Sequence, residues 1–196
     1  MKKRLWIISL ALTALGVYGT LAWAEGPSDY VRGILGQVMA IQNNPALAGP
    51  ARAREIRRVI QKSFDFPLMA KSSLGPVYDR LNPAQRQDFV NTFGYLFQDS
   101  YTRMVLNFLK QETIKYHQGH RENGQARVNT TIVRANETIP VDYLMRRQQQ
   151  GWLLYDVNVD GVSILDNYKT QFAQVIRSQS FESLLNKMKT QQRATQ

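Results

Sequence analysis

The chain has 196 residues, contains no cysteine, and carries 25 Lys and Arg against 15 Asp and Glu, which gives a formal net charge of +10. The absence of cysteine excludes disulfides, thiolate metal sites and a cysteine nucleophile. The positive charge favours acidic partners, such as anionic lipid head groups or an acidic protein surface.

The first 24 residues have the pattern of a secretory signal peptide. Residues 2–4 are basic, residues 5–21 are mainly apolar, and residues 22–24 (AWA) match a cleavage site. Cleavage after Ala24 would remove three basic and no acidic side chains, leaving a charge of +7. An uncleaved anchor is the alternative, because the apolar stretch is long for a signal peptide. No later stretch is long enough to span a bilayer, so we expect an exported, soluble mature protein.

Basic residues are densest between residues 52 and 62, where five of them fall on one predicted helix. No aromatic residues alternate with them, as they would in a surface that stacks nucleic-acid bases. We therefore expect no nucleic-acid partner. A solvated helix face is the simplest interpretation of this group, and docking to an acidic partner is the alternative.

Three helices are predicted in the first part of the mature chain. The first begins at Pro27 and carries apolar residues at steps of three and four. The second follows Pro50, with its arginines on the outer face. The third runs from Pro67 to Gly75, where a glycine followed by a proline ends it.

The longest predicted helix begins at Asn82, where Pro83 and Gln85 complete a capping-box pattern. A wide apolar stripe then follows helical spacing through Phe89, Phe93, Leu96, Phe97, Tyr101, Met104 and Phe108. With the apolar residues of positions 64–81, the stripe offers more bulky surface than one helix contact needs. Either the protein's own core or an apolar ligand must cover it.

Beyond residue 110 the apolar pattern becomes alternating. Four strands are predicted, at residues 112–118, 126–134, 138–147 and 152–159, and their short links make neighbours antiparallel. One apolar face should carry Ile139, Val141, Tyr143, Met145, Leu153, Tyr155, Val157 and Val159. Pro140 cannot donate a ladder hydrogen bond, so it should mark a bulge or an unpaired edge position.

Helical spacing returns after Gly161, in two apolar stripes that end near Met188, and a polar tail covers residues 190–196. We therefore expect a signal peptide at 1–24, a single domain at 25–189, and the tail. The order of elements predicts an α+β fold, in which an antiparallel sheet of about four strands is covered on one face by N- and C-terminal helices.

The sequence offers little for catalysis or metal binding. His117 and His120 lack a third ligand at metal-site spacing. Asp156, Asp160 and Asp166 could form an acid/base pair or a calcium site, but a turn and a helix start explain the last two more simply. We expect no enzyme, no catalytic residues, no metal and no cofactor.

Two blocks of residues suggest a family. The first contains Phe64, Asp65, Phe66, Met69, Ala70, Leu74, Gly75, Tyr78, Gln85, Phe89 and Phe93. The second contains Val141, Asp142, Tyr143, Gly151, Trp152, Tyr155, Asp156, Val157, Gly161, Val162, Ser163, Tyr168, Phe172, Leu184 and Leu185. Together they resemble the MlaC family, also called toluene-tolerance auxiliary proteins, from about Val31 to Lys189. Tyr78 stands where many members carry Trp, an aromatic exchange that puts little in doubt.

The resemblance implies a periplasmic phospholipid carrier with an apolar pocket between sheet and helices. Its ligand would be a glycerophospholipid with buried acyl chains, a head group near solvent, and little head-group specificity. Its partners would be an inner-membrane ABC transporter complex with an MlaD-type subunit and an outer-membrane lipoprotein complex of the MlaA type. Such shuttling maintains the lipid asymmetry of the outer membrane.

Eleven residues are the candidates for lipid contact: Leu74, Tyr78, Phe93, Phe97, Tyr101, Val141, Tyr143, Tyr155, Val157, Val162 and Leu165. For each one, ordinary core packing is an equal alternative, because a helix that covers a sheet has the same pattern with or without a cavity. An exported interaction module without a lipid ligand and a hopanoid-associated branch of the same family also remain open.

Overall fold

The computed structural model describes residues 26–149 and 151–195, so the predicted signal peptide lies outside the described residues. The helices are α1 (Pro27–Gln42), α2 (Gly49–Ser63), α3 (Phe66–Leu74), α4 (Pro76–Arg80), α5 (Pro83–Phe108), α6 (Ile164–Ser178) and α7 (Phe181–Ala194). The strands are β1 (Thr113–Tyr116), β2 (His120–Glu122), β3 (Gln125–Arg134), β4 (Glu137–Gln148), β5 (Gly151–Val159) and β6 (Val162–Ser163). The order of helices, sheet and helices confirms the predicted α+β class.

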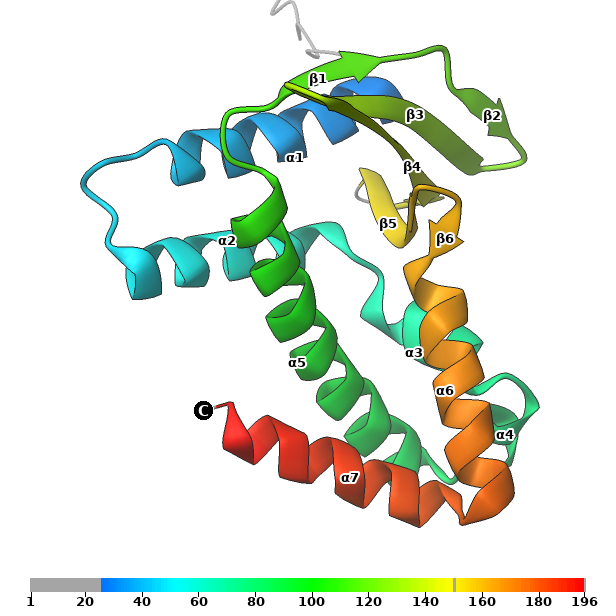
Figure 1. Ribbon diagram of the computed structural model, residues 1–196. Helices are drawn as coiled ribbons and strands as arrows, with labels where there is room; N and C mark the ends of the chain where they lie inside the picture. The colour runs from blue at the N-terminus through cyan, green and yellow to red at the C-terminus, as the bar shows by residue number, and fades with distance from the viewer. Residues whose placement is uncertain (1–25, 150, 196) are drawn as a thin grey trace, which may run out of the picture.

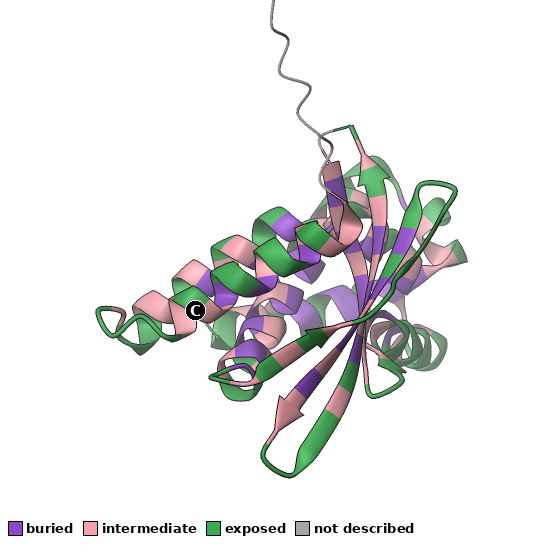
Figure 2. Cartoon of the chain, turned by 90° about the horizontal axis from the view of Figure 1, so that it is seen from above, coloured by how far each residue is buried: buried purple, intermediate pink, exposed green. Residues whose placement is uncertain are grey.

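The strands form one antiparallel sheet in the order β1-β3-β4-β5-β6, with β2 also paired to β3. Figure 1 shows the sheet at one end of the molecule, with α5 and α6 running away from it and α7 crossing their far ends. Buried residues concentrate where strands meet helices, whereas the hairpin ends are exposed (Figure 2). The helices therefore cover one side of the sheet and leave its loops in solvent.

Helix α5 begins as its sequence predicts. The Asn82 side chain accepts a hydrogen bond from the Gln85 backbone N–H at 2.9 Å, and the Gln85 side chain accepts one from the Asn82 N–H at 3.0 Å. This reciprocal capping satisfies two backbone donors that a helix start otherwise leaves unpaired. Gly75 ends α3 with φ of 56°, a conformation that favours glycine. Pro76 then starts the short helix α4, which was not among the predicted helices.

The predicted face of β5 is wrong for two residues. Leu144 pairs with Asp156 but its neighbour Met145 pairs with Leu154, so Tyr155 is an extra, bulged residue. The bulge reverses the alternation, and Trp152 and Leu154 are buried in place of Leu153 and Tyr155. Tyr155 instead lies with Leu144 on the opposite face of the sheet.

Pro140 does not form this bulge. It pairs with Thr131 across β3, and its carbonyl oxygen accepts a hydrogen bond from Asp160 N at 2.9 Å. In a strand the N and C=O of one residue point to the same side, so the missing donor faces β5. The β4–β5 ladder begins at Val141, so the missing donor lies at the end of that ladder, where its loss costs little. Pro140 is itself paired with β3 in a central strand, so the prediction of a bulge or an unpaired edge position is wrong.

The remaining differences concern two short strands and the C-terminus. Strand β2, of three residues, falls in the link between the first two predicted strands, and β6, of two residues, falls where helical spacing was expected to return after Gly161. Helix α7 continues to Ala194, so most of the predicted polar tail belongs to the last helix.

Candidate functional site

An apolar cavity separates the C-terminal half of α5 from the sheet. Its volume is about 80 Å³, and it is lined by Tyr101, Met104, Val105, Phe108, Leu109, Ile132, Arg134, Ile139, Val141, Tyr143, Val157 and Val159. Helix α5 supplies one wall, and β3, β4 and β5 supply the other. Almost every group that faces the space is apolar, so it suits hydrocarbon and offers few polar contacts for orienting a ligand.

The apolar stripe of α5 divides between core and cavity. Phe89, Phe93 and Phe97 are at most 1% exposed, and the Phe93 ring lies 5.4 Å from that of Tyr168 on α6. From Tyr101 onward the same stripe faces the cavity. The protein's own core therefore covers the first part of the stripe, and the second part borders empty space.

The structure brings four of the candidate residues together around this cavity: Tyr101, Val141, Tyr143 and Val157. Phe97 stacks on Tyr101 at 5.4 Å between ring centroids and so lies one side chain behind the wall. Leu74, Phe93 and Leu165 are buried elsewhere in the core. These placements leave lipid contact at each position a prediction.

Three candidate residues lie farther from the cavity. Tyr78 is half-buried on α4, with the Arg86 guanidinium 5.4 Å above its ring. Val162 on β6 is 54% exposed and pairs with Val159 of the cavity wall. Tyr155 lies on the other face of the sheet because of the bulge, so its expected place in the pocket is wrong.

Several lining residues were not among the candidates: Met104, Val105, Phe108, Leu109, Ile132, Arg134, Ile139 and Val159. The sequence held a signal for some of them, since Met104 and Phe108 continue the α5 stripe, and Ile139 and Val159 share the predicted apolar face. The sequence pattern shows which side of each helix or strand is apolar. It does not show that a gap between the helices and the sheet lies at the C-terminal end of α5.

The cavity wall contains two phenols, from Tyr101 and Tyr143. Burial raises the pKa of both well above its usual value, and an interaction with Thr130 opposes the shift at Tyr143. Both groups therefore remain neutral at physiological pH. Their hydroxyls give the wall a few polar atoms without a charge.

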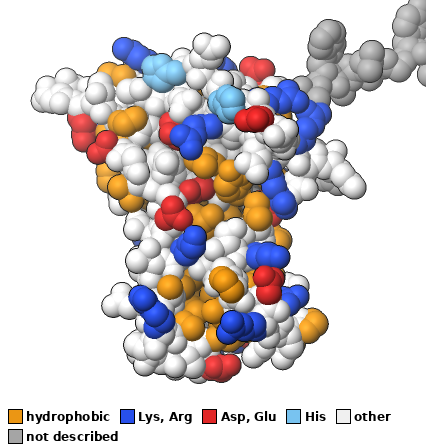
Figure 3. Space-filling model, turned by 90° about the vertical axis from the view of Figure 1, so that its right-hand side faces the viewer, with side chains coloured by type: hydrophobic (Ala, Val, Ile, Leu, Met, Phe, Trp, Pro, Cys, Tyr) orange, Lys and Arg blue, Asp and Glu red, His pale blue; other side chains and the backbone are white. Residues whose placement is uncertain are grey.

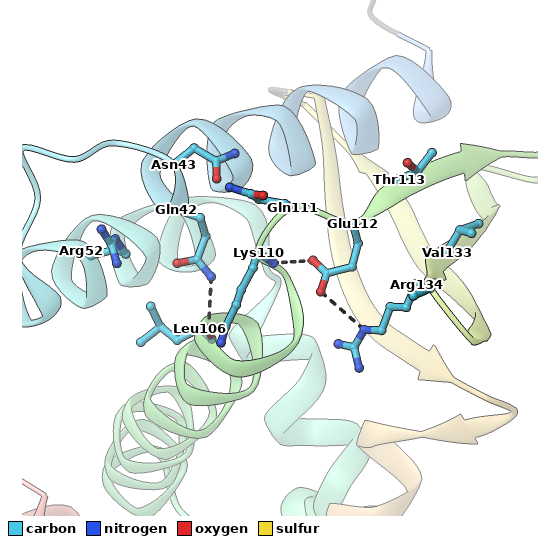
Figure 4. Close-up of a pocket in the computed structure, with 11 residues that line it drawn as sticks. Gln42, Asn43, Arg52, Leu106, Lys110, Gln111, Glu112, Thr113, Val133 and Arg134 are labelled. Carbon is cyan, nitrogen blue, oxygen red and sulfur yellow. Dashed lines mark hydrogen bonds and ion pairs between the residues drawn. The ribbon is translucent and has the colours of Figure 1, made fainter.

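A larger and more open hollow adjoins the cavity at the end of α5 (Figure 4). Its volume is about 970 Å³, and it is lined by Gln42, Asn43, Arg52, Leu106, Lys110, Gln111, Glu112, Thr113, Val133, Arg134 and Ala135. Three cations, Arg52, Lys110 and Arg134, line it against the single carboxylate of Glu112. We call it the basic hollow. Arg134 lines both spaces and marks their border.

Asp156, one of the three aspartates considered for chemistry, has a structural role. Asp156 accepts hydrogen bonds from Val157 N, Leu165 N and Ser163 Oγ, at 2.8, 3.0 and 2.5 Å. It therefore fixes the start of α6 to the end of β5. Within residues 26–149 and 151–195, no group of three His, Cys, Asp or Glu residues could hold a metal ion.

Apolar side chains also reach the surface near the cavity. In Figure 3, which shows the right-hand side of the view in Figure 1, hydrophobic side chains gather down the middle of the face among dispersed charges. Phe108 and Val162 are the large hydrophobic residues most exposed in the described chain, at 49% and 54%. In the same part of the chain, no helix is both long and apolar enough to cross a membrane.

Together the fold and the cavity define an α+β protein with an apolar space between its helices and its sheet. A family model described as MlaC protein matches residues 33–190, which is most of the chain. The chain therefore belongs to the MlaC family, and the resemblance inferred from the sequence is confirmed.

The chain is similar to two known proteins, one by sequence and one by structure. The intermembrane phospholipid transport system binding protein MlaC of Haemophilus influenzae is 28% identical over 129 residues, which cover 63% of this chain and 59% of that protein. The solved phospholipid-binding protein from Ralstonia solanacearum, in complex with a phospholipid, has a TM-score of 0.73 at 22% identity. That match covers 84% of this chain and 97% of the other and shows that the two share a fold.

Proposed function

We propose that this protein is a periplasmic carrier that binds a glycerophospholipid and moves it between the outer and inner membranes. In this proposal its partners are an MlaA-type outer-membrane lipoprotein complex and an inner-membrane ABC transporter with an MlaD-type subunit. The carrier maintains outer-membrane lipid asymmetry and catalyses no reaction. Export through the predicted signal peptide, with cleavage after Ala24, gives it access to both membranes.

One observation carries the proposal: the helix layer and the sheet leave an apolar cavity of about 80 Å³ between them. Val141, Tyr143 and Val157 face α5 across this space. Each methylene moved out of water contributes about 0.8 kcal/mol, so acyl chains supply a large driving force without any placed polar group. Membership of the MlaC family and the transport role in the name of the Haemophilus relative support the same conclusion.

The size of the cavity adds a requirement. At about 80 Å³ it is smaller than the roughly 300 Å³ at which pockets for drug-sized ligands begin, and a diacyl lipid is larger still. The two layers must therefore move apart when lipid enters. The C-terminal half of α5 and the facing strands are the surfaces that have to separate, since they form both walls.

The test is a mass spectrum of a solvent extract from protein purified without detergent. A carrier yields intact phospholipid at about one molecule per chain. An interaction module yields none and copurifies with a protein partner, and a hydrolase yields lipid breakdown products on incubation. A hopanoid in place of phospholipid would assign the chain to the hopanoid-associated branch. The absence of lipid, the formation of breakdown products, or the presence of a hopanoid would each overturn the proposal.

A further inference from the structure

The basic hollow lies directly beside the end of the apolar cavity. The end of α5 and the two residues after it separate the two spaces: Val105 and Leu109 line the cavity, whereas Leu106 and Lys110 line the hollow. Arg134 at the end of β3 lines both. A lipid whose chains fill the cavity would therefore place its glycerol near Arg134.

Arg134 is held in position at this border. It donates a hydrogen bond from Nη2 to the Phe108 carbonyl oxygen at 2.6 Å, and its guanidinium carbon lies 5.1 Å from the centre of the Phe108 ring. Its Nε is ion-paired with a Glu112 oxygen at 3.4 Å, but this buried donor makes no hydrogen bond to any described residue. A guanidinium with a donor outside any hydrogen bond suits a phosphate oxygen.

The charges around the hollow leave an excess of positive potential. Glu112 is engaged by Arg134 and also accepts a hydrogen bond from the Lys110 backbone N–H. Glu137 lies 3.7 Å from Arg134, but it is exposed and does not line the hollow. Within the described parts of the chain, the side chains of Arg52 and Lys110 form no ion pair. Arg52 Nη2 donates to the Asn44 carbonyl oxygen at 3.3 Å, and Arg52 Nε is buried without a hydrogen-bond partner.

Carbonyl groups at the end of α5 would repel an anion, because the C-terminus of a helix carries partial negative charge. Most of these carbonyls already accept a hydrogen bond. The Gln42 amide donates to the oxygens of Val105 and Leu109, and Arg134 donates to that of Phe108. The hollow therefore presents cations to a bound anion, with its main source of repulsion covered.

We infer that the basic hollow holds the phosphate of the lipid head group, with Arg134, Arg52 and Lys110 as its partners, while the acyl chains fill the apolar cavity. The inference rests on the proposed function and deepens it. It adds to the expected low head-group specificity a requirement for the phosphate, which all glycerophospholipids share.

The experiment compares two lipids with identical chains on delipidated protein. Dioleoylphosphatidylglycerol carries the phosphate, and dioleoylglycerol lacks it. We expect the wild-type chain to bind the phospholipid at least about tenfold more tightly, because hydrogen bonds between charged groups are the stronger kind. Equal affinity for the two lipids would overturn the inference and leave the carrier proposal intact, whereas binding of neither lipid would overturn both.

The variant Arg52→Gln/Lys110→Gln removes two of the cations and leaves the contacts of Arg134 in place. It should lose most of the preference for phospholipid and keep the wild-type affinity for dioleoylglycerol. The control Arg54→Gln/Lys187→Gln removes the same charge from two exposed residues, Arg54 being on the same helix as Arg52, and should bind both lipids as wild type does. An equal loss in both double variants would mean that net charge, not the hollow, sets the preference, and would overturn the inference.

Inorganic phosphate separates a head-group site from a site for the free anion. Because phosphate lacks the chains, it should not bind detectably at concentrations that saturate the protein with phospholipid. Phosphate binding as tight as that of the phospholipid would assign the hollow to the free anion and contradict the inference.

Discussion

Tyr143 places a phenol in the cavity wall at 4% exposure, and burial raises its pKa well above the usual value of 10.0. The phenol of the unfolded chain ionises first, so the stability due to this group is complete below about pH 10 and falls as pH rises further. Between pH 9 and 11, wild type should lose about 1.4 kcal/mol more unfolding free energy than Tyr143→Phe. Urea unfolding at the two pH values measures the free energy of unfolding of both proteins. An equal loss of unfolding free energy in wild type and in Tyr143→Phe would show that the Tyr143 phenol does not cause the pH dependence.

A charged substitution at Val159 tests whether lipid occupies the cavity. It is half-buried on β5 and lines the cavity, so a carboxylate there would face hydrocarbon without a partner. Val159→Glu should reduce bound phospholipid at least about tenfold, since the cost of burying an unpaired charge is several kcal/mol. Lipid content is read from the solvent extract of the folded variant.

The matched control is Leu153→Glu, a half-buried aliphatic residue on the same strand that points to the opposite face. It should retain wild-type lipid. If both variants lose lipid equally, the effect comes from β5 as a whole, and the cavity assignment is wrong.

At single positions, the sequence predicts burial better than it predicts the site. Alternation in β4 placed Val141 and Tyr143 on the cavity wall correctly. The prediction for Tyr155 was wrong because the bulge at this residue reverses which face of the sheet the preceding side chains of β5 point to. No glycine or proline at this position indicates the bulge in the sequence. Arg134 was missed because a charged residue at a strand end has the pattern of a solvated position.

Asp65 joins helix α3 to the sheet. Its carboxylate is 4% exposed and accepts hydrogen bonds from Leu68 N, Arg146 Nε and Gln148 Nε2, while its own backbone N–H donates to Leu154 O. This residue therefore caps α3 and fixes it to β4 and β5 together.

Asp65→Ala should destabilise the fold by about 3 kcal/mol, because it removes a helix cap and two hydrogen bonds to a buried carboxylate. Urea unfolding monitored by circular dichroism measures the change. Asp79→Ala is the control: this carboxylate is 63% exposed, pairs with Lys71 at 3.2 Å, and should cost less than about 1 kcal/mol. Similar losses in the two variants would refute the tie between α3 and the sheet.

Among the elements, those with strong local signals were predicted well. Capping residues and prolines marked the starts of α1, α2 and α5, and four of the strands followed from alternation. Strands β2 and β6 could not be predicted, because segments of three and two residues carry no periodicity and form only by pairing with β3 and β5. Helix α4 could not be predicted either, because its five residues are too few to show a helical period.

The molecule as a whole separates two tasks along α5. The first part of the helix packs on α6 and α7 in an aromatic core, where the ring of Phe89 lies 5.8 Å from Phe172 and 5.9 Å from Phe181. The last part borders the cavity and the basic hollow. Under the proposed function, the packed half keeps the fold intact while the half that borders the cavity receives the ligand.

The sequence could predict this architecture but not the division. The stripe from Phe89 to Phe108 is continuously apolar, so nothing in it distinguishes residues that meet a partner side chain from residues that meet space. The distance between layers depends on the volumes of all facing side chains at once. The distance between the helices and the sheet is therefore a property of the packed molecule, and only the three-dimensional structure shows it.

The most direct test of the central claim is a crosslinking map with a phospholipid that carries a photoreactive diazirine near the end of one acyl chain. After illumination and proteolysis, mass spectrometry should find the lipid on residues 101–109 of α5 and on the facing parts of β3, β4 and β5, within residues 132–159. Excess unlabelled phospholipid should abolish the signal. Crosslinks confined to the outer face of the sheet around Tyr155, or spread evenly over the surface, would contradict an acyl-chain site between α5 and the sheet.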